Sequence, residues 1–169
     1  RRQTELHDEA MNAAASLARI MKRRPLTPSE EQRLLSSLQR ARMACNAAVL
    51  VDENAPAKSP KLDELRRILE DVCVEEGRKV VVFSQWERMT KLAEEVAGAL
   101  GLGTVRLHGG VATGRRGALI ERFREDPATQ VFISTDAGGV GLNLQAGEVL
   151  VNLDLPWNPA VLAQRVARV

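Results

Sequence analysis

A glycine-rich segment, STDAGGVGLNL at residues 134–144, combines residue types that can bind phosphate. Ser134 and Thr135 supply hydroxyls and Asp136 supplies a carboxylate at the end of an apolar run, and three glycines follow within four residues. Glycines permit positive φ angles and let backbone N–H groups approach a phosphate or a sugar closely. On glycine content alone a plain tight turn is the better explanation, so the rest of the chain must decide.

A second glycine-rich segment, GGVATGR at residues 109–115, has the glycine spacing of a P-loop without its chemistry. Arg115 stands where a lysine would bind phosphate, and Arg116 stands where a Ser or Thr hydroxyl would hold Mg²⁺. The segment also follows the second predicted strand of its domain instead of the first. We therefore do not expect this chain to cradle the β- and γ-phosphates of a nucleotide by itself.

Side chains that can donate hydrogen bonds to a nucleic-acid backbone follow the predicted strands. The set is Gln85, Arg106, His108, Ser134 and Thr135, with Arg115 and Arg116 behind it. Such donors commonly contact phosphate oxygens, which positions a protein on a duplex without reading its sequence. The alternative is that Gln85 and Arg106 are merely solvated and that His108 holds a turn.

Two arginines, Arg165 and Arg168, lie three residues apart on the final predicted helix. That helix begins with Asn158 as its N-cap and Pro159 at its first position. A guanidinium suits phosphate because its planar fork donates two parallel hydrogen bonds. For two arginines taken alone, however, an ordinary surface helix is the default explanation.

The elements that must position these side chains alternate between strand and helix from residue 61 onward. KVVVFS is typical of a parallel strand buried on both faces, and TVRLH, QVFIST and EVLVNLD are predicted to be further strands. Helices are predicted between them, near residues 87–100 and 115–125. This alternation predicts βαβ units, and hence an α/β fold with a parallel sheet covered by helices on both faces. Ligands bind such sheets beyond the carboxyl ends of the strands, where the candidate residues fall.

Residues 1–60 are predicted to form a helical arm and a linker ahead of the α/β lobe at residues 61–169. The motif TPSE at residues 27–30 predicts a helix start with a capping box and a proline at the first helical position. This helix should run to about Asn46, and residues 52–60 read as a linker because of their prolines and charges. Its apolar side chains are expected to face a core: Leu34, Leu35, Leu38 and Met43.

The charge balance does not identify a nucleic-acid binder, because 24 basic residues face 22 acidic ones and the net charge is +2. Arginine outnumbers lysine, which suits phosphate but also fits a GC-rich genome. Aromatic residues make up 3% of the chain, so Trp86 and Trp157 are expected to pack instead of stacking on bases. Cys45 and Cys73 lie far apart and are expected to be buried thiols. No apolar run is long enough to span a membrane.

Four segments follow one another along the chain: VVVFSQW, RLHGGVATGRRGALIERF, STDAGGVGLNLQAGEVLVNLDLPWNPA and QRVARV. They resemble motif IV, the segment after it, motif V with its following strand, and the opening of motif VI in Swi/Snf-type helicase-like ATPases. SLQRARMACNAAVLV and SPKLDEL resemble the stretch that introduces the second lobe of these enzymes. The resemblance covers about residues 34–169, and Ala167 departs from it where motif VI usually has glycine. It identifies the chain as the C-terminal RecA-like lobe of a bacterial member.

The resemblance implies the second motor lobe of an ATP-dependent translocase or remodeller that acts on double-stranded DNA. Arg168 would be an arginine finger that reaches the γ-phosphate of ATP held by the first lobe, and Arg165 belongs to the same catalytic motif. Thr135 and Gln85 would lie against a DNA strand. The residues implied at the nucleotide are Gly139, Gly141, Asn143 and Gln164.

The implied cofactors are ATP and Mg²⁺, held mainly by the N-terminal RecA-like lobe of the same protein. That lobe and double-stranded DNA are the expected partners, at the nucleoid in the cytoplasm. The isolated chain is expected to be inactive as an ATPase, because it lacks a P-loop and its motif VI is truncated. Two alternatives stay open. Motif order does not distinguish a strand-separating helicase from a translocase, and a non-catalytic nucleic-acid-binding module could have kept the fold.

Overall fold

A computed structural model of the chain describes residues 1–138 and 142–169. These residues form two compact units, Arg1–Ser59 and Pro60–Val169, each with its own hydrophobic core. The elements of the first unit are α1 (Arg2–Met21), α2 (Pro28–Asn46) and the 3₁₀ turn η1 (Ala48–Leu50).

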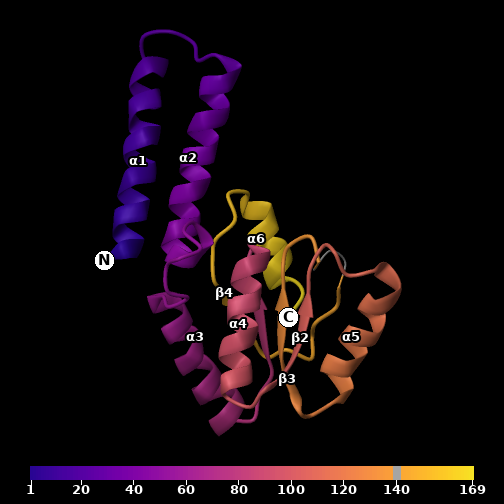
Figure 1. The fold of residues 1–169 in the computed structure, drawn as a ribbon. Coiled ribbons are helices and arrows are strands. Elements are labelled where there is room, and N and C mark those ends of the chain that lie inside the picture. Colours follow the sequence, from indigo (N-terminus) through magenta and orange to yellow (C-terminus); the bar gives the residue numbers. More distant parts are fainter. Residues whose placement is uncertain (139–141) are drawn as a thin grey trace. The chain divides into compact units, whose positions relative to one another are not determined.

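The first unit is a helical hairpin in which α1 and α2 lie side by side (Figure 1). The start of α2 confirms the predicted capping box. The Thr27 hydroxyl accepts the Glu30 N–H at 3.3 Å, and the Glu30 carboxylate accepts the Thr27 N–H at 2.9 Å. The expectation that Leu35 faces a core is wrong, because its side chain is 65% exposed. Within this unit α2 packs mainly against α1, and the small residues Ala41 and Ala44 make the buried stripe.

The second unit alternates between helix and strand, as the sequence predicts. Its elements are α3 (Pro60–Leu69), the π-helical turn η2 (Glu70–Glu75), β1 (Val80–Phe83), α4 (Glu87–Ala99), β2 (Gly103–Leu107), α5 (Thr113–Glu125), β3 (Thr129–Ser134), β4 (Val149–Asn152) and α6 (Pro159–Val166). The helical stretch before β1 ends at Gly77, whose φ of 68° is a value that glycine adopts without strain. Asn158 caps α6 as predicted, because its side chain accepts the Ala160 N–H at 2.9 Å.

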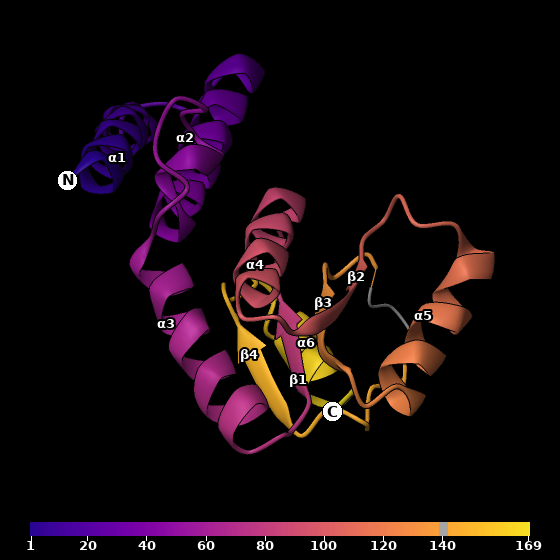
Figure 2. The same cartoon turned by 60° about the horizontal axis from the view of Figure 1, so that its bottom comes forward.

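The described strands form a four-stranded parallel sheet in the order β2-β3-β1-β4, which confirms the predicted α/β fold. In Figure 2, α3 and α4 lie on one side of this sheet and α5 and α6 on the other. Successive residues of a strand point to opposite faces of the sheet. Val81 and Phe83 point toward α5, where they join a core cluster with Phe123 of that helix. The strands therefore form a rigid support for the segments that follow them.

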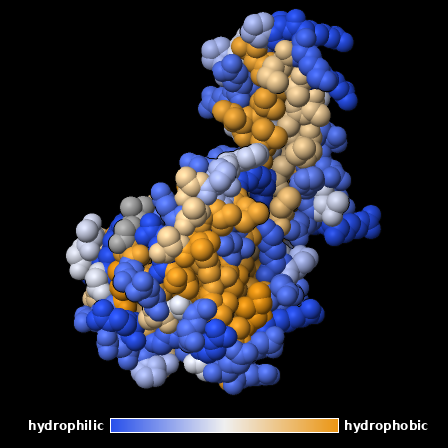
Figure 3. Space-filling model, turned by 180° about the vertical axis from the view of Figure 1, so that it is seen from behind, coloured by the Kyte–Doolittle hydropathy of each residue, from blue (hydrophilic) through white to orange (hydrophobic). Residues whose placement is uncertain are grey.

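Several large apolar side chains of the second unit are exposed, and Figure 3 shows that hydrophobic surface gathers on this unit. Trp157 is 71% exposed, so the expectation that it packs in the interior is wrong. It lies in the proline-flanked turn between β4 and α6, and such connections run over the surface. Cys73 is buried as expected, but Cys45 is exposed on α2. Among the described residues, no helix combines the length and apolar character needed to cross a bilayer.

Candidate functional site

The carboxyl ends of the four strands meet along one edge of the sheet. Phe83 at the end of β1 is level with Ser134 of β3 and with Asn152 of β4, and Leu107 of β2 is level with Ser134. The pairing continues beyond the strands, since the Thr135 N–H donates to the Leu107 carbonyl at 3.1 Å. The segments that carry the candidate residues are thereby brought together, although they lie far apart in the sequence.

Arg165 of α6 lies inside this edge and is 1% exposed. Its guanidinium forms a bidentate ion pair with Asp136, with Nε–Oδ1 at 2.6 Å and Nη2–Oδ2 at 2.8 Å. The same group donates to Asn152 Oδ1 at 3.0 Å and to the Asp154 carbonyl at 2.7 Å. The guanidinium carbon also lies 5.5 Å from the centre of the Phe83 ring. A buried cation is tolerated only when it is paired and hydrogen-bonded in this way.

Asp154 extends these contacts to the end of β1. Its carboxylate lies 3.5 Å from Arg165 Nη2, accepts the Ser84 hydroxyl at 2.5 Å and accepts the Gln85 N–H at 3.0 Å. The Ser84 hydroxyl oxygen accepts the backbone N–H of Trp86 at 3.1 Å. A continuous set of hydrogen bonds therefore links the predicted motif IV segment, the end of β4, α6 and Asp136 of the predicted motif V.

These contacts correct the expectation that Arg165 acts on the nucleotide. Burial lowers the pKa of Arg165, but the hydrogen bonds and charge of Asp136, followed by those of Asp154, raise that pKa above its usual value. The residue stays cationic, and its donors are directed at protein oxygens. Asp136, Asn152 and Asp154 were missed as partners of Arg165. The sequence does contain a signal for this pairing: a polar residue ends or follows each apolar strand, and an arginine lies on the helix after the last strand.

Arg168 differs sharply from Arg165, three residues earlier. It is half-buried, and among the described residues its guanidinium makes a single hydrogen bond, to the Leu142 carbonyl at 3.3 Å. Arg168 and the exposed Gln164 line a small hollow together with Asp136 and Phe83. Within the described part of the chain, most N–H donors of Arg168 have no protein partner, which is the condition for binding a phosphate.

The loop after β3 places Thr135 beside Arg165's partner Asp136. The hydroxyl oxygen of Thr135 accepts the Gly138 N–H at 3.2 Å. A Cβ added at Gly138 would come within 2.7 Å of the Leu107 carbonyl oxygen. Only glycine fits there without moving the end of β2. Ser134 is fully buried and donates to the Thr135 carbonyl at 2.8 Å, so its predicted contact with nucleic acid does not fit the structure. The predicted nucleotide residues Gly139 and Gly141 lie outside the described residues.

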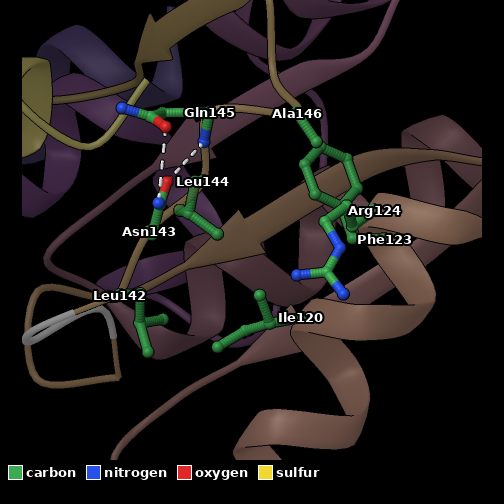
Figure 4. Close-up of a pocket in the computed structure, with 8 residues that line it drawn as sticks. All are labelled: Ile120, Phe123, Arg124, Leu142, Asn143, Leu144, Gln145 and Ala146. Atoms are coloured by element: carbon green, nitrogen blue, oxygen red, sulfur yellow. Dashed lines mark hydrogen bonds between the residues drawn. The ribbon is translucent and has the colours of Figure 1, made fainter.

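Asn143 lies at a pocket of about 320 Å³ between α5 and the segment that leads to β4 (Figure 4). Its side chain is exposed but engaged, since Oδ1 accepts the Gln145 N–H at 3.1 Å and Nδ2 lies 3.4 Å from Gln145 Oε1. Ile120 and Phe123 of α5 line the other side of this pocket. Asn143 thus closes a turn, and the structure does not bring it to the hollow that Gln164 and Arg168 share.

The remaining nucleic-acid candidates lie on the β1 and β2 ends. Arg106 is ion-paired with Glu94 at 2.8 Å, and Glu87 lies 4.0 Å away from it. His108 Nδ1 lies 3.3 Å from the Gly110 N–H and 3.4 Å from Glu87 Oε1. It can accept from Gly110 only when it is unprotonated and donate to Glu87 only when it is protonated. Arg106 and His108 therefore stand among carboxylates that compete with phosphate.

Comparison with known proteins identifies the family. The sequence model of one protein family, the helicase conserved C-terminal domain, matches residues 60–169. The chain belongs to that family. Among curated relatives, the chain is 36% identical over 105 residues to "Helicase swr1" of Schizosaccharomyces pombe, which covers 62% of this chain. It is 32% identical over 153 residues to the human "SWI/SNF-related matrix-associated actin-dependent regulator of chromatin subfamily A member 1", which covers 82% of it.

The chain spans 8% of the length of the first relative and 14% of the second. Its fold matches solved structures of Swi2/Snf2 ATPase C-terminal lobes. The C-terminal part of the Fun30 ATPase domain matches with a TM-score of 0.77 at 20% identity, covering 99% of this chain and 76% of that one. The Sulfolobus solfataricus SWI2/SNF2 ATPase core in complex with dsDNA matches with a TM-score of 0.77 at 21% identity, covering 96% and 35%. This helicase C-terminal lobe therefore has the RecA-like fold that the sequence resemblance implies.

Proposed function

We propose that this chain is the second motor lobe of an ATP-dependent translocase or remodeller acting on double-stranded DNA, with Arg168 as its arginine finger. The observation that carries the proposal is the contrast between two arginines on one short segment. Arg165 is buried among protein oxygens, whereas Arg168 makes one described hydrogen bond and keeps its other donors for a ligand. An arginine supplied from a separate lobe can stabilise the charge that develops on the γ-phosphate.

ATP and Mg²⁺ would be held mainly by the first lobe, and this chain would approach the nucleotide with Arg168 and Gln164. The hollow that these two residues line is far too small to enclose a nucleotide, which suits a surface that meets one side of it. Lobe closure would bring Arg168 to the γ-phosphate, so that hydrolysis depends on closure. The lobe alone is accordingly proposed to have no ATPase activity. The proposed place of action is the bacterial nucleoid.

The DNA-facing surface in this proposal is formed by Thr135, Gln85, Arg106 and His108 at the strand ends. A relative named a helicase and a structural neighbour solved with dsDNA support DNA as the partner, and the choice of these four residues rests on their place at the strand ends. Hydrogen bonds from such groups to phosphate oxygens would hold the duplex without reading its sequence. Such backbone contacts would be the same for a translocase and for a strand-separating helicase, so these donors do not distinguish the two.

Steady-state ATPase kinetics of the full-length protein at saturating DNA test the finger. Arg168→Ala should lower kcat by about 10³-fold with little change in nucleotide affinity, because the charge acts mainly in the transition state. Arg168→Lys should restore little, since an ammonium cannot replace the bidentate fork. The matched control is Arg122→Ala on α5, whose side chain is 56% exposed. If Arg168→Ala and Arg122→Ala have the same kcat, Arg168 is an ordinary surface residue and the proposal is wrong.

A further inference from the structure

The helix that precedes Arg168 is attached to the sheet by a buried cation. α6 is 8 residues long, and a helix this short is unstable in water on its own. Arg165 is the one buried residue of α6, whereas Val161 and Leu162 are half-buried. The position of this helix therefore depends on the contacts of Arg165 more than on apolar packing.

The contacts of Arg165 reach the ends of three strands. Asp136 follows β3, Asn152 ends β4, and the Phe83 ring at the end of β1 lies 5.5 Å from the guanidinium carbon. Asp154 adds a carboxylate whose side chain is 7% exposed. Without the guanidinium, the buried carboxylate of Asp154 and the half-buried carboxylate of Asp136 would lose their shared cation, which is unfavourable.

Arg168 lies two residues after the end of α6, so its place depends on the same attachment. Its carbonyl accepts the Leu144 N–H at 2.8 Å, and its side chain reaches the Leu142 carbonyl. Val169, the next residue, packs against the core cluster on the α5 face of the sheet. The backbone of Arg168 is therefore held on both sides, by Arg165 before it and by the 142–144 segment beside it.

We infer that Arg165 is a positioning residue for the ATPase reaction: it fixes Arg168 at the place from which Arg168 acts and does not touch the nucleotide. This inference rests on the proposed function of Arg168. A misplacement of about 1 Å in a catalytic group can cost about 10²-fold in rate. Loosening the Arg165 contacts should therefore slow hydrolysis even though every N–H donor of Arg168 is retained.

A double-mutant cycle in the full-length protein tests this, with kcat measured per folded molecule at saturating ATP and DNA. Arg165→Met keeps a long side chain without the charge and should lower kcat by about 10²-fold. Because Arg165 acts through Arg168, the double variant Arg165→Met/Arg168→Ala should have a kcat within about threefold of Arg168→Ala alone. Arg122→Met, the same change on an exposed helix face, should leave kcat unchanged.

Should Arg165→Met fail to fold, Asp136→Asn carries the test, because it weakens the ion pair and leaves both arginines in place. It should lower kcat by about tenfold and show the same non-additivity with Arg168→Ala. If the fold-reduction in kcat of a double variant equals the product of the two single reductions, Arg165 acts independently of Arg168 and the inference is wrong. An unchanged kcat in well-folded Asp136→Asn and Arg165→Met proteins would also overturn it. An unchanged kcat in Arg168→Ala would instead overturn the proposed function.

Discussion

The Ser84 hydroxyl donates a 2.5 Å hydrogen bond to the carboxylate of Asp154, which lies 70 residues later in the chain. Both side chains are buried, and the bond joins the end of β1 to the end of β4. The Ser84 oxygen also accepts the Trp86 N–H, so this small side chain serves two partners. Hydrogen bonds to an ionised group are stronger than those between neutral groups.

Ser84→Ala should therefore destabilise the protein by about 2 kcal/mol, because it leaves a buried carboxylate without one of its donors. The matched control is Ser134→Ala at the end of the neighbouring β3. Ser134 is equally buried but donates to a neutral carbonyl at 2.8 Å, so the expected loss is about 1 kcal/mol. Urea unfolding followed by circular dichroism measures both. An equal or larger loss for Ser134→Ala would show that the charge of Asp154 adds nothing.

Duplex DNA should bind this chain only weakly, with a Kd of roughly 10⁻⁴ to 10⁻⁶ M that rises steeply with salt and does not depend on sequence. Glu94→Gln should tighten binding about two- to threefold, because Glu94 holds Arg106 at 2.8 Å and competes with phosphate. Glu95→Gln removes the same charge from an exposed neighbour and serves as the control. Fluorescence anisotropy at several salt concentrations measures these affinities. Equal effects of the two substitutions would exclude Arg106 from the DNA-binding surface.

The carboxyl group of Glu30 should titrate far below the usual range of a glutamate. Hydrogen bonds from Arg24, and then from the Thr27 N–H, lower its pKa to about 2. Because the folded-state pKa is lowered, the contribution of this group to stability is complete above the unfolded pKa and is lost as the pH falls from about 4.5 to about 2. An NMR titration of the Glu30 side-chain carbon checks the midpoint. Arg24→Ala should move it upward, and an unmoved midpoint would contradict the pairing.

The two cysteines should react at very different rates with a thiol reagent. Cys73 is buried, and burial raises its pKa to about 11, so little thiolate forms at pH 8. Cys45 is exposed on α2. Ellman's reagent at pH 8 should modify one thiol in the folded chain and both in guanidinium chloride. Cys45→Ser should remove the fast reaction, and a fast reaction that persists in this variant would show that Cys73 is accessible.

Periodicity and capping rules are enough to predict the helices and strands of this protein. The β-branched run at β1, the capping box at Thr27 and the cap at Asn158 depend on neighbouring residues, and each forms as predicted. The environment of Arg165 depends on contacts that cross the sheet. Its partners lie 29 and 11 residues away in the sequence, and strand order makes them neighbours. Sequence rules place an arginine at the surface by default, so its burial follows only from the assembled sheet.

The exposure of Leu35 and Trp157 has a related physical reason. Helical spacing shows that apolar residues share a stripe, but the width of the buried stripe depends on how many elements cover it. Within its unit α2 is covered mainly by α1, and Leu35 falls outside the contact. The residue type of Trp157 predicts packing, whereas its exposure follows from the turn in which it lies.

The sequence order of the Arg165 contacts has a consequence for synthesis on the ribosome. Asp136 and Asp154 are translated before α6, so both carboxylates leave the ribosome without the cation that they surround in the finished lobe. Asp154, whose side chain is 7% exposed in the finished lobe, must stay hydrated until Arg165 emerges, because burying a carboxylate without its cation is unfavourable. The strand ends can therefore close only after α6 has been made. A nascent chain interrupted before that point would contain all four strands, but the ends of the strands would lack the contacts of Arg165. Such a chain would be accessible to the proteases that degrade unfinished proteins.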